Sequence, residues 1–129
     1  MICKKFRLFI ALAAALVISA CASTVVIDDD LSSAEIMQRA QEAMDRNRYE
    51  TAIQYYQALY ARNQTNIDLI ITAEYHIAHI KFKQKKYDEA REGFNGVLSY
   101  YTTADAILLP QHFMILSKIV LENIDEKER

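Results

Sequence analysis

Apolar residues recur at helical spacing from residue 31 onward, and only Gly93, Gly96 and Pro110 interrupt the pattern. Ser32 followed three positions later by Glu35 is typical of a helix start, because each side chain can bind the other residue's backbone N–H. We therefore predict a first helix from about residue 33 to 46.

Three further helices are predicted from similar signals. The second follows Asn47 and Glu50 and ends near residue 62; the third is capped by Thr65 ahead of Asp68 and reaches about 84. The fourth runs from Tyr87 to about residue 100. Only a few residues connect one helix to the next, and such short connections make consecutive helices antiparallel neighbours.

The helical pattern also repeats along the chain. Equivalent residues lie 38 positions apart: Ala40 and Ala78, Tyr49 and Tyr87, Ala52 and Ala90, Tyr56 and Phe94, Leu59 and Val97. Small residues let two helix backbones approach closely, and the aromatic residues fill the groove between one helix pair and the next. A small residue in the first helix, then Tyr, Ala and an aromatic in the second, resembles the tetratricopeptide repeat.

The resemblance implies an all-α fold of antiparallel helix-turn-helix repeats, with two repeats at about residues 33–66 and 67–101. It is closest in kind to the longer repeats of periplasmic outer-membrane lipoproteins of the barrel-assembly type. An unrelated helical bundle that happens to repeat is the alternative. The helical domain would cover residues 32–129, and its core would contain Ile36, Ala40, Ala52, Ile53, Tyr56, Leu59, Ile77, Ala78, Ala90, Phe94 and Val97.

A last helix is predicted at about residues 103–127, with Pro110 breaking or starting it. One of its faces is apolar, and its far end is charged. We expect it to cap the open end of the stack. Apolar surface left over on this helix could also form an interface with a partner or a second copy, so a homo-oligomer is possible.

The N-terminal segment has the pattern of a targeting signal. Basic residues precede an uncharged run from Leu8 to Ala20, which is shorter than the roughly 20 apolar residues that span a membrane. Ile18-Ser19-Ala20-Cys21 resembles a bacterial lipobox. The resemblance implies a signal peptide at residues 1–20, cleavage before Cys21, lipid on the Cys21 sulfur, and a tether at 21–31. An ordinary signal peptide with a chance Cys, or an uncleaved anchor, is the alternative.

The residues after Cys21 refine the expected location. Sorting usually retains bacterial lipoproteins in the inner membrane when Asp follows the Cys, and here Ala22 and Ser23 follow. The resemblance therefore favours the periplasmic face of an outer membrane. Three aspartates, Asp28 to Asp30, are expected to keep the tether solvated; weak Ca²⁺ binding is the other interpretation of them.

Composition and charge narrow the functional classes. The chain is 52% hydrophobic with two Gly and one Pro, which excludes collagen-like, linker-like and most turn-rich all-β folds. Loss of the signal removes three cations and leaves 12 Lys and Arg against 17 Asp and Glu, a net charge near −5. That balance argues against a nucleic-acid binder and against membrane attachment through charge. Cys3 would leave with the signal, so no thiol would remain for catalysis, metal binding or a disulfide.

Few residues suggest site chemistry. His76 and His79 lie three apart on the third helix, but a zinc site needs three or four ligands, and His112 belongs to another element. We therefore predict an exposed or groove-lining pair and no metal site. The cations from Lys81 to Lys86 stabilise a helix C-terminus or meet an acidic partner. No catalytic or phosphate-loop motif is present, so we predict a non-enzymatic protein without a cofactor.

Tetratricopeptide stacks usually bind peptides along the face formed by the first helix of each pair. Carried onto this chain, that face would hold Met37, Gln41, Met44, Thr72, Tyr75, His79 and Phe82. Met and aromatic residues with a few polar groups suit an adaptable peptide groove. The alternative is that the other repeat or the last helix buries these residues.

These observations together predict a lipid-anchored module that binds a protein or peptide partner in the cell envelope. The first hypothesis is an accessory or adaptor subunit in outer-membrane protein or envelope assembly. The alternatives are a pilotin-like chaperone for a secretin or pilus, or a helical-repeat lipoprotein that handles a small ligand with a periplasmic binding protein.

Overall fold

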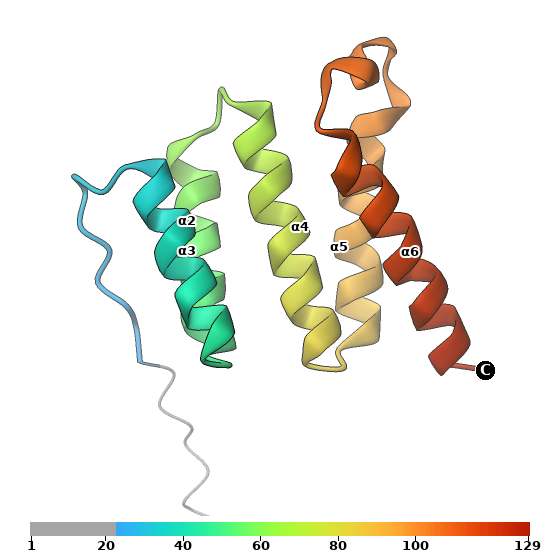
Figure 1. Ribbon diagram of the computed structural model, residues 1–129, viewed down its shortest axis with the longest axis horizontal. Helices are drawn as coiled ribbons and strands as arrows, with labels where there is room; N and C mark the ends of the chain where they lie inside the picture. Colours follow the sequence, from blue (N-terminus) through green and yellow to red (C-terminus); the bar gives the residue numbers. More distant parts are fainter. Residues whose placement is uncertain (1–22) are drawn as a thin grey trace, which may run out of the picture.

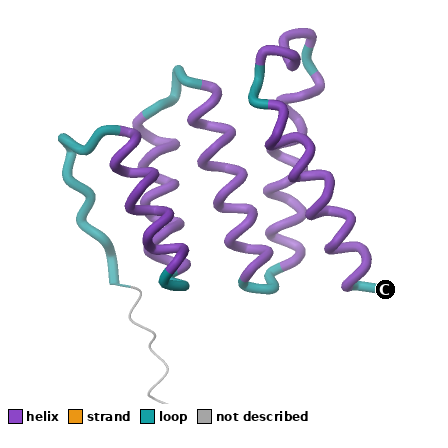
Figure 2. Tube along the Cα trace, in the orientation of Figure 1, coloured by secondary structure: helices purple, strands orange, loops and turns teal. Residues whose placement is uncertain are grey.

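The computed structural model describes residues 23–129, and this part of the chain is all-helical without strands. Five α-helices form a row in which the chain direction alternates (Figures 1 and 2). They are α2 (Ser33–Asp45), α3 (Tyr49–Arg62), α4 (Ile67–Lys83), α5 (Tyr87–Ser99) and α6 (Gln111–Lys127). Two 3-10 turns, η1 (Tyr100–Thr102) and η2 (Ala104–Leu108), join α5 to α6. The predicted signal peptide and Cys21 lie outside the described residues.

Local signals account for most helix boundaries. The Ser32–Glu35 capping box is confirmed, because both reciprocal hydrogen bonds are present. The predicted cap of the third helix is wrong by one residue: the side chain of Asn66 accepts the hydrogen bond from the Leu69 N–H. The last helix begins at residue 111 and not near 103, because Pro110 fixes an extended backbone at its N-cap.

The α2–α3 and α4–α5 turns share one geometry. Asn47 and Lys85, 38 positions apart, both have positive φ, at 54° and 61°. In each turn the next residue's N–H binds a carbonyl five positions back, from Arg48 to Ala43 at 2.8 Å and from Lys86 to Lys81 at 3.0 Å. These bonds satisfy carbonyls that the helix end leaves unpaired.

The core consists of two clusters that share α4. One lies between α2 and α3 and includes Ala73 and Ile80 of α4, while the other joins α4, α5 and α6. Because α4 packs on two sides, it is apolar around most of its circumference. The predicted core is confirmed except at Ile77, which is half-buried against the first cluster.

Helices α4 and α5 approach most closely where small residues meet. A Cβ atom placed on Gly93 would lie 2.7 Å from the Cβ of Ala78, too close for any real side chain. Gly96, one turn further along α5, has open space beside it. Gly93 is therefore required for the spacing of these two helices, whereas Gly96 is not.

The segment from residue 23 to 31, which we call the strap, lies against the α2–α3 pair. Val25, Ile27 and Leu31 pack on the first core cluster. The Val25 N–H donates to the Gln54 side chain at 2.8 Å, and Gln54 donates back to the Ser23 carbonyl at 3.3 Å. The strap therefore differs from the solvated tether that its aspartates predicted.

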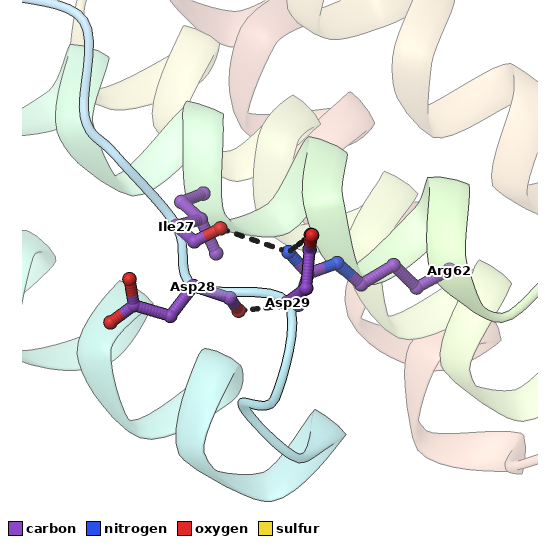
Figure 3. A network of polar contacts seen from close by, with 4 residues as sticks. All are labelled: Ile27, Asp28, Asp29 and Arg62. Atoms are coloured by element: carbon purple, nitrogen blue, oxygen red, sulfur yellow. Dashed lines mark hydrogen bonds and ion pairs between the residues drawn. The ribbon is translucent and has the colours of Figure 1, made fainter.

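Arg62, at the end of α3, holds the middle of the strap (Figure 3). Its guanidinium donates to the backbone carbonyls of Ile27 at 3.1 Å and Asp28 at 3.0 Å, and it pairs with the Asp29 carboxylate at 3.4 Å. Two of these three contacts are to main-chain oxygens, so the strap's path depends more on Arg62 than on the aspartate side chains.

The opposite edge of the row is uncovered. Ile115 and Ile119 of α6 are 53% and 47% exposed, and Ile107 and Leu108 of η2 are more than three-quarters exposed. The other face of α6 packs on α4 and α5 through Phe113, Val120 and other residues of the second cluster. None of the helices in residues 23–129 has both the length and the apolar composition to cross a membrane.

Candidate functional site

A groove of about 500 Å³ crosses three helices, α2, α4 and α6. Two of these helices, α2 and α4, are the ones that the repeat pattern assigns to one face of the stack. The lining residues are Gln41, Met44, Asp45, Tyr75, His76, His79, Lys83, His112, Phe113 and Leu116. The site therefore combines residues that are far apart in the sequence, and it depends on the packing of α6 against α4.

The floor of the groove is apolar and aromatic. Met44, Tyr75 and Phe113, one from each helix, are less than a tenth exposed. The ring centroids of Tyr75 and Phe113 lie 4.9 Å apart, and those of Tyr75 and Phe94 of α5 lie 5.7 Å apart. Burial raises the pKa of the Tyr75 hydroxyl, so it stays protonated and can donate a hydrogen bond at neutral pH.

The rim is polar and carries both signs of charge. Gln41, Asp45 and Lys83 are exposed, and Gln41 donates to the Asp45 carboxylate at 3.0 Å. His112 is also exposed, and its ring lies 4.0 Å from that of Phe113. An aromatic floor with such a rim offers apolar contact below and hydrogen bonds above, which suits an amphipathic segment better than a small apolar molecule.

The three histidines converge on this groove. The His76 ring stacks on Tyr56 of α3, with centroids 4.8 Å apart and planes 7° from parallel. Burial, with His79 and His112 nearby, lowers the pKa of His76 to about 4. Burial and then the Lys83 ammonium lower the pKa of His79. Both imidazoles are therefore neutral at pH 7, each with one donor and one acceptor nitrogen.

Metal binding by these histidines has no geometric basis in residues 23–129. No three side chains of His, Cys, Asp or Glu in that range are close enough to share an ion. The same holds for the aspartates of the strap. His76, His79 and His112 therefore contribute aromatic surface and hydrogen-bonding nitrogens to the lining of the groove.

Four of the seven predicted groove residues line the observed groove: Gln41, Met44, Tyr75 and His79. The other three lie elsewhere. Met37 packs on the first core cluster, Phe82 on the second, and the Thr72 hydroxyl donates to the Asp68 carbonyl at 2.7 Å. Met37 and Phe82 thus pack against the two core clusters and Thr72 bonds within α4, so these three side chains do not line the groove.

Sequence reasoning missed the contribution of α6. Phe113 and Leu116 were assigned to the capping helix, and His112 to an element separate from the other histidines. The available signal was the repeat itself: the small residues Ala40 and Ala78 are followed by another small residue, Ser117, 39 positions further on. Extending the repeat to a third unit would have placed α6 beside α4 on the groove face.

The lysine run at the end of α4 separates into different roles. Lys81 pairs with Glu89 of α5 at 2.9 Å, and Lys83 reaches the groove. Lys85 and Lys86 lie exposed in the turn. Lys81 and Lys83 are in the last turn of α4, where cations interact favourably with the helix dipole.

Comparison with known proteins gives one informative match. The chain is 34% identical over 108 residues to an uncharacterized protein of Treponema pallidum (strain Nichols), and the match covers 81% of this chain. The chain spans 43% of the length of that relative. No family model and no solved structure matches. The match gives this helical segment a counterpart within a longer protein and assigns it no activity.

Proposed function

We propose that this chain is a membrane-anchored protein-binding module, in which the groove across α2, α4 and α6 holds a peptide segment of an envelope partner. The observation that carries the proposal is the groove itself: three helices each contribute one buried side chain, Met44, Tyr75 and Phe113, to a common floor. A polar rim surrounds it. This composition is typical of adaptable protein-binding surfaces.

A tetratricopeptide-like arrangement is part of the proposal. The matching turns at Asn47 and Lys85 support it. So do the small residues Ala40, Ala78 and Ser117, which recur at spacings of 38 and 39 and are at most 2% exposed. Each lies in the first helix of a unit, where close packing needs a small side chain. One extra residue before α6 accounts for the change of spacing.

The module is anchored, in this proposal, through lipid on Cys21 and works at an outer membrane as a non-enzymatic adaptor in envelope assembly. The support is the lipobox-like sequence before Cys21 and the absence of Asp after it. Mass spectrometry of the full-length protein from its own host tests this step. A diacylglyceryl adduct on Cys21, lost in Cys21→Ala, supports the anchor; an unmodified mature N-terminus refutes it.

The groove is tested by photo-crosslinking in the host. A photoreactive amino acid replaces Leu116, which lines the groove, or Ile119, which lies on the same helix outside it and is similarly exposed. We expect a discrete crosslinked partner at Leu116 that is absent at Ile119. Crosslinks at both positions, or at neither, would contradict the groove as the binding site. The partner's identity then distinguishes an assembly adaptor from a chaperone for a secretin.

A further inference from the structure

A second depression lies on α2 and α3, away from the groove, with a volume of about 300 Å³. Three arginines line it, together with Thr51 and Tyr55: Arg39 within α2, Arg46 at the C-cap of α2 and Arg48 at the N-cap of α3. We call it the arginine pocket. Arg39 and Arg46 are seven residues apart and therefore share one face of the helix.

None of the three guanidinium groups lies within ion-pair distance of a carboxylate in residues 23–129, although the Glu35 carboxylate is near enough to Arg39 for an electrostatic interaction. The ion pairs in that range involve Arg62, Lys81 and Arg91 instead. One carboxylate, that of Glu42, lines the pocket and accepts a hydrogen bond from Gln38 at 3.1 Å. The pocket thus holds three positive charges against one negative charge.

The neighbouring carboxylates are engaged elsewhere. Asp45 lines the groove and accepts from Gln41 at 3.0 Å, and Glu50 accepts from Gln84 of α4 at 3.0 Å. Arg48 also occupies the N-cap position of α3 without a side-chain cap. A cation there is unfavourable for the helix, because that end of the helix dipole is positive. The equivalent N-cap residue of α5, Lys86, is also a cation without a side-chain cap, so the case for an anion rests on the three arginines around the pocket and not on the helix start.

The strap starts at the same end of the molecule as the α2–α3 turn, which holds Arg46 and Arg48. It runs beside α3 in the same direction, since Ser23 contacts Gln54 and Asp28 contacts Arg62 further along that helix. In Figure 1 the described chain accordingly begins at the bottom, level with the helix ends that the α2–α3 and α4–α5 turns connect. Cys21 is two residues from Ser23, a reach of about 7 Å.

We propose that the arginine pocket binds a phosphate-type anion, supplied by the headgroup of an anionic phospholipid. Guanidinium groups form paired hydrogen bonds with phosphate oxygens, and the Thr51 and Tyr55 hydroxyls add further donors. A headgroup bound here orients the anchored module with its turns toward the bilayer. The lipid source rests on the membrane anchor proposed above, whereas the anion chemistry does not depend on it.

The first arm of the test uses inorganic phosphate. The full-length chain in neutral detergent is titrated by calorimetry, beside Arg39→Gln/Arg46→Gln/Arg48→Gln and a matched Lys118→Gln/Lys127→Gln/Arg129→Gln variant. Both variants change the net charge by the same amount at exposed positions. Phosphate affinity should fall about tenfold or more in the first variant, since charged hydrogen bonds are lost. The second should bind as the parent does.

A conservative variant separates site geometry from charge. With all three arginines replaced by Lys, we expect weakened phosphate binding, because Lys lacks the planar fork. Circular dichroism checks that each variant keeps its helices. Equal phosphate affinity in the parent and the Gln variant, or equal losses in both Gln variants, would overturn the pocket.

The second arm identifies the source of the anion. The full-length chain is placed in nanodiscs of phosphatidylcholine, with or without phosphatidylglycerol, and amide hydrogen exchange is followed. We expect phosphatidylglycerol to slow exchange in residues 46–52, and only when the arginines are present. Phosphate binding without this protection supports a soluble anion and overturns the headgroup source. Failure of Cys21 lipidation leaves the phosphate arm unaffected.

Discussion

The contact between Gly93 and Ala78 allows a paired test of how α4 and α5 are spaced. Gly93→Ala and Gly96→Ala make the same chemical change, one turn apart on the same helix. Each should gain roughly 1 kcal/mol from helix propensity, because Ala restricts the unfolded chain more than Gly does. They differ in what the new methyl group meets.

At Gly96 the methyl group enters open space, so we expect the gain of about 1 kcal/mol to appear in full. At Gly93 it meets the Ala78 Cβ at 2.7 Å and the Ala78 Cα at 3.3 Å, neither of which can rotate away. Overpacking of this kind costs about 1–3 kcal/mol. The difference between the two variants isolates that steric cost, since the propensity gain is common to both.

Urea unfolding of the full-length chain, followed by circular dichroism, measures the two free energies of unfolding. A third variant, Ala78→Gly/Gly93→Ala, moves the methyl group from one helix to the other and should recover nearly the parent stability. A Gly93→Ala protein as stable as Gly96→Ala would refute the close approach. The close approach would also be refuted if the stability change of the double variant equalled the sum of the changes measured for Ala78→Gly and Gly93→Ala alone.

Four further substitutions test other contacts. Ser117→Ala should raise stability by roughly 1–2 kcal/mol in urea unfolding, because the buried Ser117 hydroxyl has no hydrogen-bond partner among residues 23–129; a loss of stability would contradict this explanation. Lys85→Gly should raise it by about 1 kcal/mol by relieving the positive φ, and Asn47→Gly by less, since Asn tolerates that region; equal effects would contradict the explanation. The pKa of His76 is about 4 in the folded state and 6.5 unfolded, so the unfolded chain binds more protons between these values. Stability should therefore be full above about pH 6.5 and fall as the pH drops toward 4. His76→Gln should flatten that slope in unfolding measured across a pH series, and an unchanged slope would assign it to the other groups around the groove.

Features controlled by nearby residues were predictable from the sequence. The capping box at Ser32 is contained within four residues, and helix faces follow from the spacing of apolar side chains. The cap of α4 was misplaced by one residue because Thr65 and Asn66 are both good caps. The choice between them depends on the geometry of the turn, which the sequence does not display.

Features that depend on distant contacts were not predictable in this way. Val25 and Ile27 precede three aspartates and read as part of a solvated linker, yet they are packed against helices about 30 residues away. The groove needed the docking of α6, whose register shifts by one residue relative to the first two units. The net charge of the chain also did not indicate its local charge distribution: acidic residues outnumber basic ones, yet three arginines line one pocket.

The strap makes the two edges of the helical row different with respect to the addition of further helices. At the α2–α3 edge its apolar side chains occupy the surface that a preceding helix pair would need. At the α6 edge Ile115 and Ile119 remain exposed. An engineered helical hairpin fused after α6 would find an apolar surface to cover, whereas one fused before α2 would first have to displace the strap. The architecture is therefore extensible from one edge.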